Sequence, residues 1–135
     1  MSNETREQYL KIALVAFGAV FLLVYPLGLV WPAGWVWHGG EGAYYLQMIC
    51  GIYVVLGLYL IAAARNPAAN RSLIAFTIWS SVVHAAIMAA QAFSDSGEHG
   101  HLVGDVPALL LVAGVLWFLS PKGERLAGAA GQSSS

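Results

Sequence analysis

The chain has 135 residues, of which 59% are hydrophobic and only 10% are charged. Soluble domains carry about 25% charged residues, so this chain has too few to cover an apolar core with a polar surface. Its formal net charge of −1 gives no basic patch of the kind that binds nucleic acid. Composition therefore predicts an integral membrane protein whose first partner is the lipid bilayer.

Four apolar runs follow one another along the chain. They cover residues 9–31, 44–64, 72–93 and 102–119. A membrane-spanning helix needs roughly 20 mostly apolar residues, a length that the first three runs reach and the fourth approaches. We therefore expect an all-α fold of four transmembrane helices, a single domain over residues 1–121. The tail at 122–135 is rich in Gly, Ala and Ser, and we expect it to be disordered.

The first run resembles a signal peptide only superficially. Its apolar stretch is longer than that of a signal peptide, and Glu4 and Glu7 precede it. No small-residue cleavage site follows it. We therefore predict that this run is a retained membrane helix.

All six Lys and Arg residues fall on one side of this arrangement. They are Arg6, Lys11, Arg65, Arg71, Lys122 and Arg125. They lie at the start of the first run, beside the connection between the second and third runs, and after the fourth run, whereas the other two connections have none. Because positively charged loops stay in the cytoplasm, both termini are predicted to be cytoplasmic. Short connections favour antiparallel neighbours, so the expected architecture is an up-down-up-down bundle.

The four histidines and four of the acidic residues gather on the opposite, outer side. They are His38, His84, His99, His101, Glu41, Asp95, Glu98 and Asp105. At 1.5 Å per residue, His84 lies roughly 13 Å below the outer end of its helix. An ionisable group at that depth usually faces the interior of the bundle. Met88, Gln91 and Asp95 follow it on the same helical face, so we predict a polar cavity lined by these residues, with His99 at its mouth.

The segment 98–105 is the second polar feature. If it is helical, His101 and Asp105 are neighbours at four-residue spacing. Alternatively, Asp105 caps the last helix and Pro107 lies in its first turn, so that this helix begins late. In that case the segment from Glu98 onwards lines an outward-facing cavity instead of touching lipid.

Three interpretations of these polar residues remain open. In the first, His84 hydrogen-bonds a neighbouring helix and the loop charges are solvated, as is ordinary in membrane bundles. In the second, His84, His101, Asp105 and Glu98 are metal ligands, a donor set that suits Zn, Cu or Fe, although no HExxH motif supports it. In the third, His84 exchanges protons near neutral pH.

Three short segments carry a resemblance to a known family. They are residues 31–35 (WPAGW), 79–85 (WSSVVHA) and 100–107 (GHLVGDVP). They resemble a family of small bacterial four-helix membrane proteins of unknown function, over nearly the whole chain. This resemblance implies a location in the bacterial inner membrane and supplies no activity.

No complete catalytic or cofactor motif is present, so enzyme activity is not the first expectation. The first expectation is a non-enzymatic accessory or scaffold protein, in a homo-oligomer or a larger membrane complex. The alternatives are a metal- or small-ligand-binding bundle with an outward-facing His/carboxylate site, which could be an enzyme, and proton-coupled transport. Four helices are few for transport, so a transporter would require an oligomer.

Overall fold

A computed structural model describes residues 1–35 and 42–120, and every regular element in these ranges is helical. In chain order the elements are α1 (Asn3–Leu22), α2 (Val24–Val30), α3 (Pro32–Trp35), α4 (Gly42–Ala63), the 3-10 helix η1 (Pro67–Asn70), α5 (Arg71–Ser94), the 3-10 helix η2 (Ser96–Leu102) and α6 (Asp105–Leu119). His38, Glu41 and the predicted tail at 122–135 lie outside the described residues.

The first predicted helix, over residues 9–31, is wrong in its bounds and in its continuity. Helix α1 begins earlier, because the Ser2 side chain accepts a hydrogen bond from the Thr5 backbone N–H at 3.2 Å and caps the helix. The helix then breaks at Leu23, and α2 leaves at an angle of 57°. Pro26 accounts for the break, because it has no N–H to donate to the Leu22 carbonyl and its ring would collide with that carbonyl.

The remaining helices lie close to their predicted positions. Helix α4 covers Gly42–Ala63 and α5 covers Arg71–Ser94, each within two residues of the prediction. The last helix begins late, as the second alternative for segment 98–105 predicts, because η2 ends at Leu102 and α6 covers Asp105–Leu119. Gly104 is the N-cap residue of α6, so Asp105 is its first helical residue and not its cap.

The helices have the length and the surface that a multi-pass membrane protein requires. Three helical stretches of the described chain are long and apolar enough to cross a membrane: Tyr44–Ala63, Pro67–Ser94 and Ser96–Leu119. Helices α1 and α2 make a fourth span if the bent pair crosses as one. Large apolar side chains on their outer surfaces are exposed, among them Leu29, Val30, Ile52, Phe76 and Phe93. In water this much exposed apolar surface would be unfavourable, whereas in lipid it is solvated.

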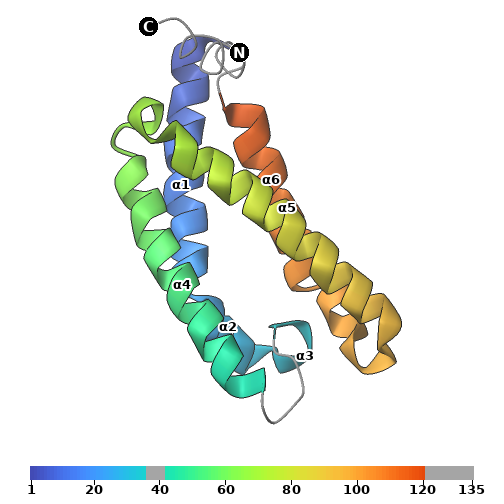
Figure 1. Cartoon of the computed structure of the whole chain (residues 1–135). Helices are drawn as coiled ribbons and strands as arrows, with labels where there is room; N and C mark the ends of the chain where they lie inside the picture. Colours follow the sequence, from blue (N-terminus) through green and yellow to red (C-terminus); the bar gives the residue numbers. More distant parts are fainter. Residues whose placement is uncertain (36–41, 121–135) are drawn as a thin grey trace, which may run out of the picture.

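The helices pack as two pairs (Figure 1). Helix α4 lies against α1, and α6 lies against α5. The α1–α4 contact is close because a Cβ on Gly57 would lie only 2.6 Å from the Gly18 carbonyl oxygen, and one on Gly18 only 2.7 Å from that of Gly57. Two glycines facing each other let the two backbones approach, as in other membrane helix pairs.

The two pairs are joined where α1 begins and α6 ends. The Arg6 guanidinium donates hydrogen bonds to the carbonyls of Phe118, Leu119 and Ser120 at distances of 2.7, 3.1 and 2.8 Å. These carbonyls belong to the last turn of α6, where a helix leaves its oxygens unpaired and carries partial negative charge. Buried apolar side chains from several helices, including Leu14, Leu60 and Leu116, pack near this junction.

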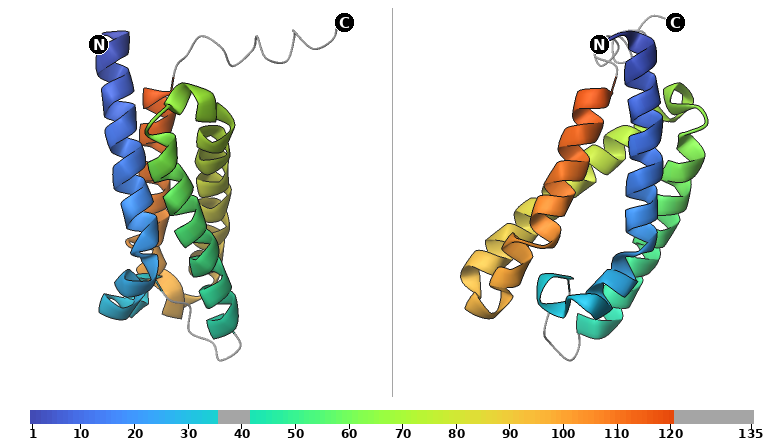
Figure 2. Two further views of the ribbon diagram at one scale, coloured as in Figure 1. Left: turned by 90° about the vertical axis from the view of Figure 1, so that its left-hand side faces the viewer. Right: turned by 180° about the vertical axis from the view of Figure 1, so that it is seen from behind.

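Away from the junction the two pairs diverge (Figures 1 and 2). Helices α4 and α5 are consecutive, yet they do not pack along their lengths in the described part of the chain. This differs from the expected bundle, in which each helix packs on the next. The order of contacts is α4, α1, α6 and α5, so the arrangement is open between its first and last members.

Candidate functional site

A cleft of about 1260 Å³ lies between the two helix pairs. Its apolar walls come from α1, α2, α4, α5 and α6, and include Phe17, Phe21, Ile49, Leu56, Phe76, Val83, Ile87, Leu109 and Val112. Pockets for small ligands occupy about 300–1,000 Å³ and are mostly apolar with a few polar groups. The cleft is larger than this range, and its walls have the mostly apolar character that suits a hydrophobic molecule.

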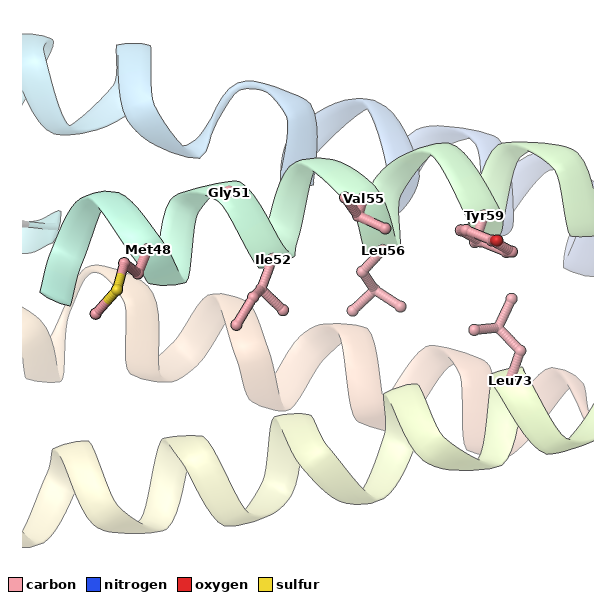
Figure 3. Close-up of a pocket in the computed structure, with 7 residues that line it drawn as sticks. All are labelled: Met48, Gly51, Ile52, Val55, Leu56, Tyr59 and Leu73. Carbon is pink, nitrogen blue, oxygen red and sulfur yellow. The ribbon is translucent and has the colours of Figure 1, made fainter.

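A shallower apolar groove of about 640 Å³ borders the cleft between α4 and the start of α5 (Figure 3). Met48, Ile52 and Leu56 extend from α4 on the side that faces α5, and Leu73 points back toward α4. Ile52 and Leu56 line both the groove and the cleft. The cleft is thus continuous with the molecular surface between α4 and α5, where a molecule could enter from the side.

Polar side chains lie along one wall of the cleft. Ser80, His84, Gln91 and Ser94 of α5 line it, as do Met88 of the same helix, Asp95 directly after it, Tyr53 of α4 and Asp105 of α6. The stripe expected on the third apolar run therefore faces a cavity, at the end of the molecule that holds η2. His99 is exposed and does not line the cleft.

His84 connects the two helix pairs across the cleft. Its Nδ1 forms a hydrogen bond with the Tyr53 hydroxyl at 2.5 Å, and the two rings stack with their centroids 5.8 Å apart. The Tyr53 ring also contacts Phe21 of α1, with ring centroids 5.0 Å apart. Because α4 and α5 do not pack along their lengths, this bond links them across the cleft. It gives the Tyr53 hydroxyl and the His84 Nδ1 a hydrogen-bond partner in an apolar environment.

A second polar cluster, formed by Glu98, His101 and Asp105, is buried where η2 meets α6. His101 is 0% exposed, and its two ring nitrogens face the two carboxylates. Nδ1 lies 2.8 Å from Oδ2 of Asp105, and Nε2 lies 3.2 Å from Oε2 of Glu98. The Asp95 side chain starts η2 by accepting a hydrogen bond from the Gly97 N–H at 2.9 Å, which turns the chain so that Glu98 and His101 point inward.

The two contacts of the His101 ring differ in kind. The 2.8 Å contact between Nδ1 and Oδ2 of Asp105 is a hydrogen bond, whereas the 3.2 Å contact between Nε2 and Oε2 of Glu98 is a close approach without hydrogen-bond geometry. The ring therefore binds Asp105 directly and lies beside the Glu98 carboxyl.

Helix α3 packs on η2 at this end of the molecule. The approach depends on Gly100, because a Cβ there would collide with the Ala33 carbonyl. The contact joins the chain after α2 to the segment before α6. It therefore connects the two helix pairs again at the end opposite Arg6.

The predicted metal ligands do not converge. Glu98, His101 and Asp105 lie together, whereas His84 bonds Tyr53 in the cleft. Within residues 1–35 and 42–120, no group of three His, Cys, Asp or Glu side chains is placed to hold a metal ion. The geometry gives the reason, since both nitrogens of His101 already face carboxylates and neither has a lone pair directed at open space.

Two residues of these contacts were not singled out from the sequence. Tyr53 lies within an apolar run that also holds three other tyrosines, and nothing in its neighbourhood marks it as the partner of His84. Arg6 was assigned to the cytoplasmic surface as one of six basic residues. Arg6 lies one turn into α1. Only the three-dimensional structure shows that this part of α1 lies beside the last turn of α6.

The fold and the cleft define an all-helical protein whose helices are apolar enough for several membrane crossings, with a mostly apolar cavity between two helix pairs. The chain belongs to DUF6632, a family of unknown function whose model matches residues 4–133. No curated protein and no solved structure matches the chain.

Replacing His101 tests the buried cluster. His101→Ala leaves two carboxylates facing each other without the ring between them, and breaking a buried charge pair costs about 3–5 kcal/mol. We expect a loss of that order in the free energy of unfolding, measured by denaturant titration in mixed micelles. His99→Ala is the matched control, because His99 is exposed on the same 3-10 helix, and it should change stability by less than about 0.5 kcal/mol. Equal effects of the two substitutions would contradict the assignment.

Proposed function

We propose that the chain spans the bacterial inner membrane four times, with both termini in the cytoplasm, and binds a small amphipathic molecule in the cleft. The bend at Leu23 supports four spans, because α1 and α2 together pass the test for a crossing. The bacterial inner membrane is the location that the family resemblance implies.

The distribution of charge supports this orientation. Arg6 lies beside the end of α6, and Arg65 and Arg71 flank the turn between α4 and α5, at the same end of the molecule (Figure 1). At the other end, η2 and its N-cap Asp95 hold Glu98 and two histidines and no Lys or Arg. The basic end would be cytoplasmic and the η2 end would face outward.

Single cysteines test this orientation. In a Cys50→Ser background, Ser96→Cys at the start of η2 and Ala68→Cys in η1 place exposed thiols at opposite ends. A membrane-impermeant maleimide applied to intact cells should label the first and not the second, and both should react after the cells are opened. Labelling of the η1 thiol in intact cells would reverse the orientation.

The observation that carries the binding function is the polar wall of an otherwise apolar cleft. A gap between helices in a bilayer is filled by lipid chains in any case, so its volume alone indicates no function. Polar and ionisable groups at membrane depth are costly, and they usually mark a site for a ligand or an ion. Here Tyr53, His84, Gln91 and Asp105 line one region of the cleft, beside apolar walls.

This proposal takes up the small-ligand alternative and leaves out metal binding and transport. A proton path would continue from His84 toward the basic end, yet the walls there are formed by Phe17, Leu56 and Val112. The scaffold interpretation concerns other surfaces, since the exposed apolar face of α4 would contact lipid, a second copy or a larger complex. Binding of a small molecule in the cleft does not depend on what covers the exposed face of α4.

Photolabelling of the purified protein in a neutral maltoside detergent tests the proposal. The probe is hexadecanol that carries a diazirine in its chain, and the labelled peptides are mapped by mass spectrometry. We expect the label to concentrate on α4 and α5 residues that line the cleft. Ala108→Trp should lower this labelling several-fold, because the indole would occupy part of the cleft.

Leu110→Trp is the matched control. Leu110 is an exposed residue of the same helix that does not line the cleft, so its replacement should leave the labelling pattern unchanged. Labelling spread evenly over all lipid-facing helices and insensitive to Ala108→Trp would contradict the proposal.

A further inference from the structure

We propose that the Tyr53–His84 pair is the headgroup site of the cleft and binds a neutral carbonyl oxygen. The preferred ligand is then a carbonyl group attached to a long alkyl or prenyl chain. This inference rests on the proposed binding function and adds the chemistry of the headgroup. It follows from the hydrogens that the pair holds and from the number that its own bond uses.

The pair holds one more hydrogen-bond donor than its own bond requires. A phenol carries one O–H and a neutral imidazole carries one N–H, and the bond between the Tyr53 hydroxyl and Nδ1 of His84 uses one of these hydrogens. If the hydroxyl donates, the second hydrogen lies on Nε2, and if Nδ1 donates, it lies on the hydroxyl. An imidazolium would add a further donor. In each arrangement, at least one N–H or O–H therefore remains unused.

The unused donor can be reached from the cleft. Tyr53 and His84 both line the cleft, and both are only partly buried. Within the described chain, Nε2 of His84 has no hydrogen-bond partner, and neighbouring atoms do not enclose it completely. A donor among apolar walls is unfavourable without an acceptor, so a ligand oxygen would gain a hydrogen bond there.

The hydroxyl groups of α5 do not supply further donors to the cleft. Ser80 donates its hydroxyl hydrogen to the Thr77 carbonyl. Ser94 donates in the same way to the Ala90 carbonyl. Gln91 also has N–H groups on this wall, but it lies two helical turns nearer to η2 than His84 does. The pair and Gln91 are therefore two donor positions at different levels of the cleft.

A neutral acceptor suits the pair better than a charged headgroup. An ammonium has no lone pair and cannot accept from the unused donor. A carboxylate can accept, but its charge would have to leave water for walls that include Phe21, Val83 and Leu109. A hydroxyl accepts and also brings a hydrogen that needs an acceptor of its own. A carbonyl requires only the donor that the pair provides.

The apolar walls indicate the rest of the ligand. On the side of the pair away from η2, the cleft continues along Phe17, Leu56 and Val112. A long alkyl or prenyl chain would cover these side chains, whereas a short ketone would leave them without a contact. The geometry therefore points to a carbonyl at the pair with its chain directed toward the Arg6 end.

Competition against the photoreactive hexadecanol tests the choice of headgroup. The competitors are hexadecan-2-one, hexadecanol and hexadecylamine at neutral pH, each compared at equal concentration. We expect the ketone to compete about fivefold better than the alcohol and the amine, the factor that corresponds to one hydrogen bond between neutral groups. Methyl hexadecanoate is a fourth competitor. An ester that competes as well as the ketone would assign the carbonyl to acyl lipids, and a weaker ester would assign it to ketones and quinones.

Infrared difference spectroscopy measures the hydrogen bond itself. Spectra of the protein with ordinary hexadecan-2-one and with the ketone isotope-labelled at its carbonyl carbon are subtracted, which isolates the C=O stretch of the ligand. We expect this band at a lower wavenumber in the protein than in detergent alone, because accepting a hydrogen bond weakens the C=O bond. An unshifted band in the wild-type protein would contradict the inference.

Substitutions by Phe separate recognition from a purely structural link. Tyr53→Phe and His84→Phe each break the bond between α4 and α5, but each leaves one donor that is no longer used. Each single variant should therefore retain a preference for the ketone, and the double variant should lose both the preference and the band shift. Continued labelling by hexadecanol shows that the cleft persists in each variant. Gln91→Leu is the control at the other level and should leave the preference unchanged.

The outcomes separate this inference from the binding function itself. If the ketone competes no better than the alcohol and the amine, or if its preference survives in the double variant, the carbonyl inference is wrong while cleft binding stands. The same holds if Gln91→Leu, or one single Phe substitution, removes the preference as completely as the double variant does. If none of the competitors reduces labelling of the cleft, the proposed binding function fails as well.

Discussion

The structure depends on one constraint, that polar groups among apolar helices must find partners inside the protein. Water offers such partners everywhere, but hydrocarbon offers none, and each unsatisfied group there costs free energy. The described chain meets this constraint at three levels. Arg6 binds the terminal carbonyls of α6, Tyr53 and His84 bind each other between the two ends of the molecule, and His101 lies between two carboxylates at the η2 end. The first two contacts join helices that are far apart in the sequence. The third fixes η2 against the start of α6.

The same contacts explain why the molecule is open on one side. Helices α1 and α4 approach closely through Gly18 and Gly57, and α5 packs on α6, so each pair is a unit. Arg6 holds the units together at one end, and the contact of α3 with η2 joins them at the other. Between these two ends, α4 and α5 meet through the Tyr53–His84 bond instead of through packed apolar side chains. The cleft is the space that this arrangement leaves. Tyr53 and His84, which form the hydrogen bond, are among the polar residues that line it.

The positions of most helices could be predicted from the sequence, but the contacts between them could not. Apolar length located α4 and α5 within two residues, and His84, Met88, Gln91 and Asp95 all line the same cleft. The bend after α1 was missed although Pro26 signals it. Gly51 and Gly57 are indistinguishable as letters, yet a side chain at Gly51 would meet nothing while one at Gly57 would meet the α1 backbone. Helix pairing and the choice of Tyr53 as the partner of His84 depend on three-dimensional packing, which local periodicity does not encode.

The divergence of the two helix pairs is the central claim, and spin-label distances across the cleft test it most directly. In a Cys50→Ser background, one labelled pair replaces Tyr44 and Phe93 near the ends of α4 and α5 that lie away from η1, and the other replaces Tyr59 and Phe76 nearer to η1; all four positions are exposed. Pulsed electron–electron resonance in lipid nanodiscs should give a clearly longer distance for the first pair than for the second. Equal distances at both levels would mean that α4 and α5 pack side by side, and the cleft would not exist.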